Sequence, residues 1–254
     1  EEDEDAALPP LGCSTLYLML SSHTPARITM PYLRWIPQLQ HLHSVTLCGL
    51  ATFPEAPLTW GGAPHVRVLD LSMPERSYTN DTQGLRTLLL GFPQLTALVL
   101  NFRYIPACLA EHLPGTLRKL SLTHCSGDLE WWRLGTQCPH LHDLRGPPTS
   151  PTPPMHWPSS LLRVDGVPWG TPLPEGVQYI SCHVQRDPHP WDAAHQAHTL
   201  ELTGPALQQT WPLLHHAQMK ALICHGSMHT PIHDLAPLQA LLSTCPRLKR
   251  LSLP

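Results

Sequence analysis

The sequence predicts an α/β solenoid, in which parallel strands build one curved sheet and short helices, 3₁₀ turns and loops return the chain along the convex side. Three observations support this fold class. A six-residue block with apolar residues at its first, fourth and sixth positions recurs eleven times between residues 13 and 253. Successive blocks begin 16 to 29 residues apart, which leaves room for one return segment between strands. Several return segments carry apolar residues at helical spacing.

The eleven blocks predict eleven strands in chain order. In a strand, alternate side chains face opposite sides, so the fourth and sixth residues of each block point into the core and the fifth points outward. The defining residues are Cys13-Leu16-Leu18, Leu42-Val45-Leu47, Val66-Leu69-Leu71, Leu95-Leu98-Leu100, Leu117-Leu120-Leu122, Leu141-Leu144-Gly146, Leu161-Val164-Gly166, Val177-Ile180-Cys182, Ala197-Leu200-Leu202, Met219-Leu222-Cys224 and Leu248-Leu251-Leu253. Gly146, Gly166 and Ala197 replace aliphatic residues, and a slip of one residue there would exchange the two faces.

The return segments are predicted to be of two kinds. Helical spacing of apolar residues predicts helices over 85–92 and 235–245, with shorter helical turns at 129–134 and 207–214. The intervals between 141 and 197 are short and rich in proline, which is excluded from helix interiors. We therefore expect only turns in that part of the chain, with a mobile loop at 147–158.

The block and its period resemble the leucine-rich repeat, whose units carry LxxLxL and run about 20–29 residues. The Cys-Pro-x-Leu segments at Cys138 and Cys245 and the Phe-Pro-x-Leu segment at Phe92 resemble the repeats of F-box receptor proteins. The Leu-Pro-x-x-Leu/Val segments at Leu113 and Leu173 are similar to repeats of bacterial effector ligases and amoebal proteins. The resemblance implies a protein-binding solenoid, and its ligase branch implies substrate recognition for a ubiquitin ligase.

Length and charge limit the domain organisation and the partners. We expect residues 1–12 to be an acidic linker or N-terminal extension and residues 13–254 to be one array of about eleven repeats, continued or capped beyond residue 254. The formal net charge of −3 and the charged fraction of 14% give no basic surface for a phosphate backbone, so nucleic acid is not expected as a partner. No apolar run approaches the roughly 18 residues of a membrane span. A small-molecule ligand is not expected either.

The eight cysteines fit packing positions better than disulfides. Six of them lie inside the blocks, just after a block or just before one, where a free thiol behaves as a small buried apolar group: Cys13, Cys125, Cys138, Cys182, Cys224 and Cys245. This favours a reduced, intracellular protein, cytoplasmic or nuclear. The opposing observation is the glycosylation sequon Asn80-Asp81-Thr82.

No set of residues predicts catalysis or a bound cofactor. The chain has no Gly-x-Ser-x-Gly motif and no phosphate-binding glycine loop ending in Gly-Lys-Ser/Thr, so we expect no enzyme activity and no cofactor. The densest group of zinc-ligand types is Cys224, His225, His229, His233 and Asp234. Cys224 is predicted to point inward and His225 outward, so we interpret these histidines as solvated and expect no metal site.

The outward side chains of the predicted sheet provide the candidate binding surface. Arginine and aromatic residues dominate the binding energy of protein interfaces. Adjacent strands lie about 4.8 Å apart, so Arg118, Lys119 and Arg145 should form one basic spot. The residues predicted to contact a protein partner on the concave face are Arg67, Asp70, Phe102, Arg118, Lys119, His124, Arg145, Asp165, Tyr179 and Glu201.

These observations favour a protein-interaction module that binds its partner through the concave face. One alternative is a structural subunit of a large multiprotein assembly, with tryptophans of the convex side buried against neighbouring subunits: Trp60, Trp157, Trp169 and Trp191. A second alternative is a metal-binding or enzymatic protein.

Overall fold

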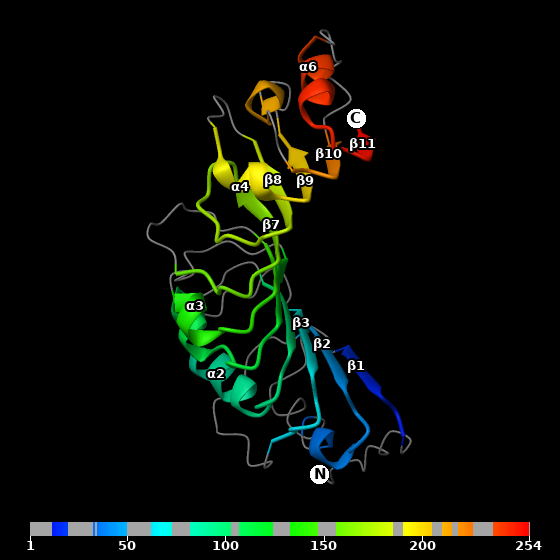
Figure 1. Cartoon of the computed structure of the whole chain (residues 1–254). Helices are drawn as coiled ribbons and strands as arrows, with labels where there is room; N and C mark the ends of the chain where they lie inside the picture. The colour runs from blue at the N-terminus through cyan, green and yellow to red at the C-terminus, as the bar shows by residue number, and fades with distance from the viewer. Residues whose placement is uncertain are drawn as a thin grey trace, which may run out of the picture.

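The described residues of the chain form one sheet of eleven parallel strands that follow each other in sequence order, as the computed structural model shows. The structure describes residues 12–19, 33, 35–49, 62–72, 82–102, 107–123, 133–146, 156–184, 190–204, 210–214, 218–225 and 236–253. The strands are β1 Thr15–Met19, β2 Ser44–Cys48, β3 Val68–Ser72, β4 Ala97–Asn101, β5 Lys119–Thr123, β6 Asp143–Arg145, β7 Arg163–Pro168, β8 Tyr179–His183, β9 Thr199–Thr203, β10 Ala221–His225 and β11 Arg250–Ser252. The whole array is curved, and the sheet lies along the inner side of the curve (Figure 1).

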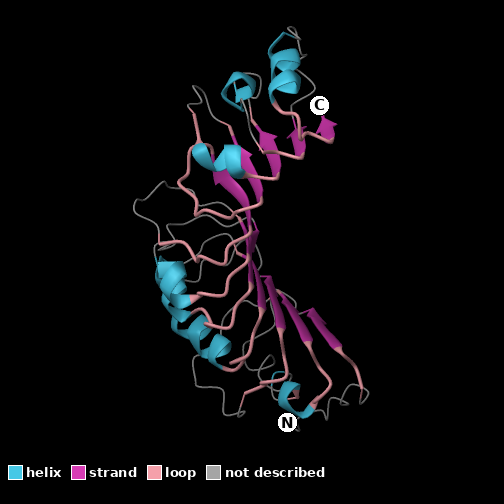
Figure 2. Ribbon diagram, viewed as in Figure 1, coloured by secondary structure: helices cyan, strands magenta, loops and turns pink. Residues whose placement is uncertain are grey.

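Short helices cover the other side of the sheet (Figure 2). They are η1 Ile36–Gln38, α2 Thr82–Leu90, η2 Ala107–His112, α3 Leu134–Gln137, α4 Asp192–Gln196, η4 Trp211–Leu214 and α6 Ala236–Thr244. The two longest, α2 and α6, match the helices predicted at 85–92 and 235–245. The repeated unit is therefore one parallel strand followed by one return segment, in a solenoid-like arrangement.

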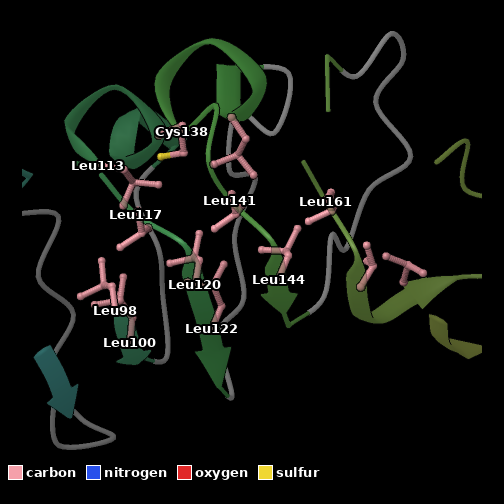
Figure 3. Close-up of a cluster of buried hydrophobic side chains, with 14 of the residues drawn as sticks. Leu98, Leu100, Leu113, Leu117, Leu120, Leu122, Cys138, Leu141, Leu144 and Leu161 are labelled. Atoms are coloured by element: carbon pink, nitrogen blue, oxygen red, sulfur yellow. The ribbon is translucent and has the colours of Figure 1, made fainter. Parts of the chain in front are cut away.

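The register predicted from the blocks is confirmed at the fourth and fifth residues of all eleven blocks, and it shifts only after the fifth residue of β7. The fifth residue of each block pairs with the fifth residue of the next, for example Asp165 with Ser181 and Ser181 with Glu201. The fourth residues of the blocks from β2 to β10, such as Leu120 and Leu144, are fully buried between the sheet and the helices, and those of the two end strands, Leu16 and Leu251, are less so. Side chains of successive repeats pack directly on one another (Figure 3). Burial of one apolar face of every strand is what fixes the register.

The two glycines at sixth positions have separate structural reasons. Gly146 follows the last residue of β6 with φ of +114°, and a Cβ on it would lie 2.2 Å from the carbonyl oxygen of Leu122. Gly166 has φ of +84° within β7, where the pairing with β8 shifts between Asp165 and Val167. This bulge lets Val167 take the buried place that the sixth residue occupies in the other repeats.

The expectation that residues 141–197 contain only turns is wrong at one place. Residues 192–196 form the short helix α4, which leads into β9. The prolines of that interval lie before Trp191, so the segment from 191 to 197 is free of proline and can complete a helical turn. Of the loop predicted at 147–158, residues 147–155 lie outside the described residues.

The described cysteines and tryptophans pack within the chain. Cys138, Cys182, Cys224 and Cys245 are buried, and none of the six described cysteines forms a disulfide. Trp191 is buried and donates its indole N–H to the carbonyl oxygen of Thr171 at 2.7 Å. Trp157 and Trp169 pack against the same core. Cys125 and Trp60 lie outside the described residues, and within the described part no helix is long and apolar enough to cross a membrane.

Candidate functional site

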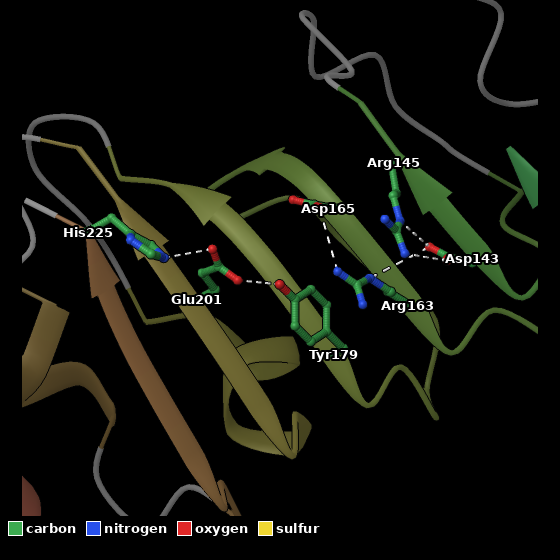
Figure 4. A network of polar contacts seen from close by, with 7 residues as sticks. All are labelled: Asp143, Arg145, Arg163, Asp165, Tyr179, Glu201 and His225. Carbon is green, nitrogen blue, oxygen red and sulfur yellow. Dashed lines mark hydrogen bonds and ion pairs between the residues drawn. The ribbon is translucent and has the colours of Figure 1, made fainter. Parts of the chain in front are cut away.

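The concave face of β6 to β10 carries a connected set of polar side chains (Figure 4). We call it the ladder; its seven residues are Asp143, Arg145, Arg163, Asp165, Tyr179, Glu201 and His225. Parallel pairing places the first residue of each strand beside the first residue of the next, so that Asp143, Arg163 and Tyr179 form one row. Arg145, Asp165 and Glu201 lie in the row two residues further along. The two rows supply all of the ladder except His225, which ends β10.

The arginine end of the ladder is organised around one carboxylate. Arg145 donates from Nε and Nη2 to the two oxygens of Asp143, at 3.2 and 3.1 Å. Arg163 lies on the other side of the same carboxylate, with its Nε 3.7 Å from Oδ1 of Asp143. The Nη2 of Arg163 is 3.8 Å from an oxygen of Asp165. Both guanidinium groups are thus held in place by carboxylates of their own or the adjacent strand, and their charges are largely compensated.

An aromatic ring links this end of the ladder to the next. The guanidinium carbon of Arg163 lies 3.9 Å from the centre of the Tyr179 ring, a cation–π contact. The Tyr179 hydroxyl donates to Oε2 of Glu201, and the other oxygen of Glu201 is 2.8 Å from Nε2 of His225. The side chains of Asp143, Glu201 and Arg163 are only 22%, 25% and 34% exposed, so the ladder is half-buried on an open face.

Two pKa shifts follow from this geometry. Burial, followed by the hydrogen bond to the Glu201 carboxylate, raises the pKa of the Tyr179 phenol above its usual value. The hydrogen bond to Asp143 raises the pKa of the Arg145 guanidinium further above its usual range. Tyr179 therefore stays a hydrogen-bond donor, and Arg145 stays a cation, throughout the physiological range of pH.

Four of the ten predicted site residues come together in the ladder: Arg145, Asp165, Tyr179 and Glu201. The prediction did not select Asp143, Arg163 and His225 as partner-contacting residues, although all three occupy outward positions of their strands. A signal for them was present in the sequence. Asp143 and Arg163 are the first residues of consecutive strands, and opposite charges at equivalent positions of adjacent parallel strands face each other.

The predicted basic spot is only partly present. Lys119 of β5 pairs in register with Asp143 of β6. Arg145 of β6 pairs with Ser121, two residues after Lys119 on β5. Arg145 turns to Asp143 instead of joining the lysine, because a bidentate contact with a carboxylate is stronger than a solvated position beside another cation. Arg118 is exposed just before β5 and remains beside Lys119.

Phe102 is a correction to the predicted surface. It lies one residue beyond β4 and is 4% exposed, within the core. The alternation that buries Leu98 and Leu100 continues to residue 102, so the ring points inward. His124 lies outside the described residues.

Arg67 and Asp70 lie apart from the ladder. The Arg67 guanidinium donates to the backbone and side-chain oxygens of Gln94, at the turn before β4. Asp70 is in the middle of β3, between Thr46 and Val99 of the adjacent strands. Burial raises the pKa of the Asp70 carboxyl. The structure thus places these two residues on the sheet at a separate position from the ladder.

The described part of the chain contains no group of three or more histidine, cysteine or acidic side chains placed to hold a metal ion. Cys224 is buried in β10 and His225 is exposed on the same strand, as the alternation predicted. The other three members of that candidate cluster, His229, His233 and Asp234, lie outside the described residues.

Comparison with known proteins gives no family for this chain. A scan against protein-family models finds no match, and a search of curated proteins finds none either.

Proposed function

We propose that this chain is a leucine-rich-repeat protein that acts as a protein-interaction module and binds its partner through the concave face. The ladder is the observation that carries this proposal. It brings two arginines and a tyrosine, the residue types that dominate interface energies, onto an open sheet face on three adjacent strands, β6 to β8. Each of the three is held by contacts with its neighbours, so binding a partner would immobilise few additional rotamers.

The resemblance to F-box receptors and bacterial effector ligases supports a narrower form of the proposal. In this form the partner on the concave face is a substrate of a ubiquitin ligase. The expected result is that ubiquitylation of the identified partner falls when the ladder is altered. Unchanged ubiquitylation, together with lost binding, would restrict the function to binding alone.

A pair of matched variants tests the concave-face proposal. The test variant is Arg163→Ala with Tyr179→Ala, and the control is Arg133→Ala on the helical side. Arg133 is paired with Glu111, and its side chain is 35% exposed, close to the 34% of Arg163. The wild-type protein and both variants are tagged, expressed as full chains in cells that naturally contain this protein, and compared by quantitative affinity purification. Circular dichroism of the purified proteins shows whether each variant folds.

The proposal predicts that one discrete partner is lost with the ladder variant and retained with Arg133→Ala. Truncation of one hot-spot residue costs about 2 kcal/mol or more, so binding of the purified partner should weaken at least about 30-fold if either of the two residues is a hot spot. Loss of partners only with Arg133→Ala would instead favour a structural subunit that contacts its assembly through the helical side.

A further inference from the structure

The residue just before each strand belongs to a second continuous row on the sheet. We call it the start row; its members are Ser14, His43, Arg67, Thr96, Arg118, His142, Leu162, Gln178, His198, Lys220 and Lys249. The backbone N–H of each member donates to the carbonyl oxygen of the member in the preceding repeat, at 2.7 to 2.9 Å. Ten such bonds run without interruption from Ser14 to Lys249. The row is therefore a regular line of side chains across the whole array.

The start row contains cations and no carboxylate. Arg67, Arg118, Lys220 and Lys249 are all exposed. Two first residues of strands, Lys119 and Arg250, add further positive charge next to the row, as does the exposed Arg247.

These cations differ from those of the ladder in having no carboxylate partner. Among the described residues, Arg118, Lys119, Lys220, Lys249 and Arg250 form no ion pair with an acidic side chain. Asp143, which pairs in register with Lys119, is already bonded to both ladder arginines. Glu201 of β9, on the strand beside β10, already contacts Tyr179 and His225. The positive charge of the start row is therefore available to a ligand, whereas that of the ladder is compensated within the sheet.

The spacing of the row defines the size of the ligand. Arg118 precedes β5 and Lys220 precedes β10, so five strand intervals of about 4.8 Å separate them, or about 24 Å. An extended peptide rises about 3.3 Å per residue and would span this distance with about seven residues. Leu162, whose side chain is 45% exposed, lies in the row between the two cationic ends. An apolar side chain in the middle of the ligand would find its contact there.

From this charge and spacing, we propose that the start row binds an acidic, extended protein segment that runs across the strands, with carboxylates at both ends and an apolar residue at Leu162. This inference rests on the proposed function, because it specifies the chemistry of the partner. A single-stranded nucleic acid fits the row less well, since binding of that kind relies on aromatic side chains that stack bases. The start row has no phenylalanine, tyrosine or tryptophan, and the nearby Tyr179 ring is covered by Arg163. Its three histidines, His43, His142 and His198, are separated from one another by at least two other members, so they offer no continuous platform for stacked bases.

A peptide titration with the full chain tests the inference. The probe is a fluorescent dodecapeptide with five glutamates at each end and two central leucines, and the control peptide has glutamine in place of every glutamate. A ten-nucleotide single strand provides the nucleic-acid comparison. The row variants are Arg118→Glu with Lys119→Glu, and Lys220→Glu with Lys249→Glu. Arg86→Glu, an exposed position on α2, is the control for a reversal of charge away from the row, and it reverses one charge where each row variant reverses two.

The expected result at about 50 mM salt is saturable binding of the glutamate peptide, weakened about tenfold or more by each row variant and less than about twofold by Arg86→Glu. The glutamine peptide should bind at least about tenfold more weakly. Equal binding of both peptides, equal effects of Arg86→Glu and the row variants, or tighter binding of the oligonucleotide would overturn the inference. If the row variants have no effect while the ladder variant still loses its cellular partner, this inference fails and the proposed function stands.

Discussion

The glycine that follows β6 gives a sharp test of how the repeats pack. A Cβ on Gly146 would lie 2.2 Å from the carbonyl oxygen of Leu122 and 2.7 Å from its Cβ. Gly176 has a comparable φ, +98° against +114°, but no atom lies within 4 Å of the position that a Cβ would take. The two glycines therefore share a backbone conformation that disfavours other residues and differ in crowding.

The difference between the two alanine variants isolates the cost of that crowding. Gly176→Ala carries a backbone cost of about 1–2 kcal/mol, of which the reduced freedom of the unfolded chain offsets about 0.4–1 kcal/mol. Gly146→Ala has the same backbone cost and the same offset from the unfolded chain. In addition, the Leu122 carbonyl of β5 has to move by more than 1 Å, since the Cβ would lie at 2.2 Å and an ordinary contact begins at 3.4 Å. We expect a loss of about 1 kcal/mol for Gly176→Ala and of about 4 kcal/mol or more for Gly146→Ala.

Thermal unfolding followed by far-ultraviolet circular dichroism and tryptophan fluorescence measures this difference. For a chain of this size, 1 kcal/mol lowers Tm by about 2–4 °C. Gly176→Ala should therefore lower Tm by about 2–4 °C and Gly146→Ala by about 8–16 °C. Equal effects of the two substitutions would refute the packing of β6 against β5 described above.

Three further predictions concern single groups of the sheet and the core. Asp70→Asn should raise Tm at neutral pH, because burial raises the pKa of this carboxyl in the native state and its ionisation therefore costs stability. The gain in Tm should shrink as the pH falls through that raised pKa and vanish below about pH 3.9, the pKa of the unfolded chain, and thermal unfolding at several pH values measures this. A double-mutant cycle of Tyr179→Phe and Glu201→Ala, each of which removes one partner of the hydrogen bond, should give a coupling of about 1 kcal/mol in denaturant unfolding. Additive effects would contradict the hydrogen bond between them. The four buried cysteines should resist alkylation at pH 8 until the chain unfolds, because burial raises the pKa of the Cys138 thiol to about 12 and the thiolate is the reactive form. Rapid labelling of the native protein at more than four of its eight cysteines, read by intact mass, would argue against this.

The strands and their register could be predicted from the sequence because burial of one face repeats a simple pattern. The alternation within each block assigned the outward residues correctly even at Gly166, where a bulge restores the buried position through Val167. The same alternation, continued one residue beyond β4, would have placed Phe102 in the core. The error arose because the rule was applied to the block and not to the residues that follow it.

The polar contacts of the site could not be predicted in the same way. Whether the Arg145 side chain faces solvent or binds Asp143 depends on the rotamer that it adopts. The sequence pattern predicts that both residues lie on the outward face of the sheet, but it does not predict which side chains bind each other. The start row could be predicted in part, because its members are the second residues of the eleven predicted blocks. The sequence did not show that its cations lack carboxylate partners, whereas those of the ladder have them. Helix α4 was missed because the proline content of a whole interval hid a short segment free of proline.

Site-specific photo-crosslinking tests most directly whether the concave face is the binding surface. A photoreactive residue is placed at Ser121, an outward position of β5, and in a second full-length variant at Thr136, an exposed position of α3 on the helical side. After irradiation in the protein's own cells, the account predicts a discrete crosslinked protein from the Ser121 position and none from Thr136. A discrete adduct from Thr136 alone would contradict it.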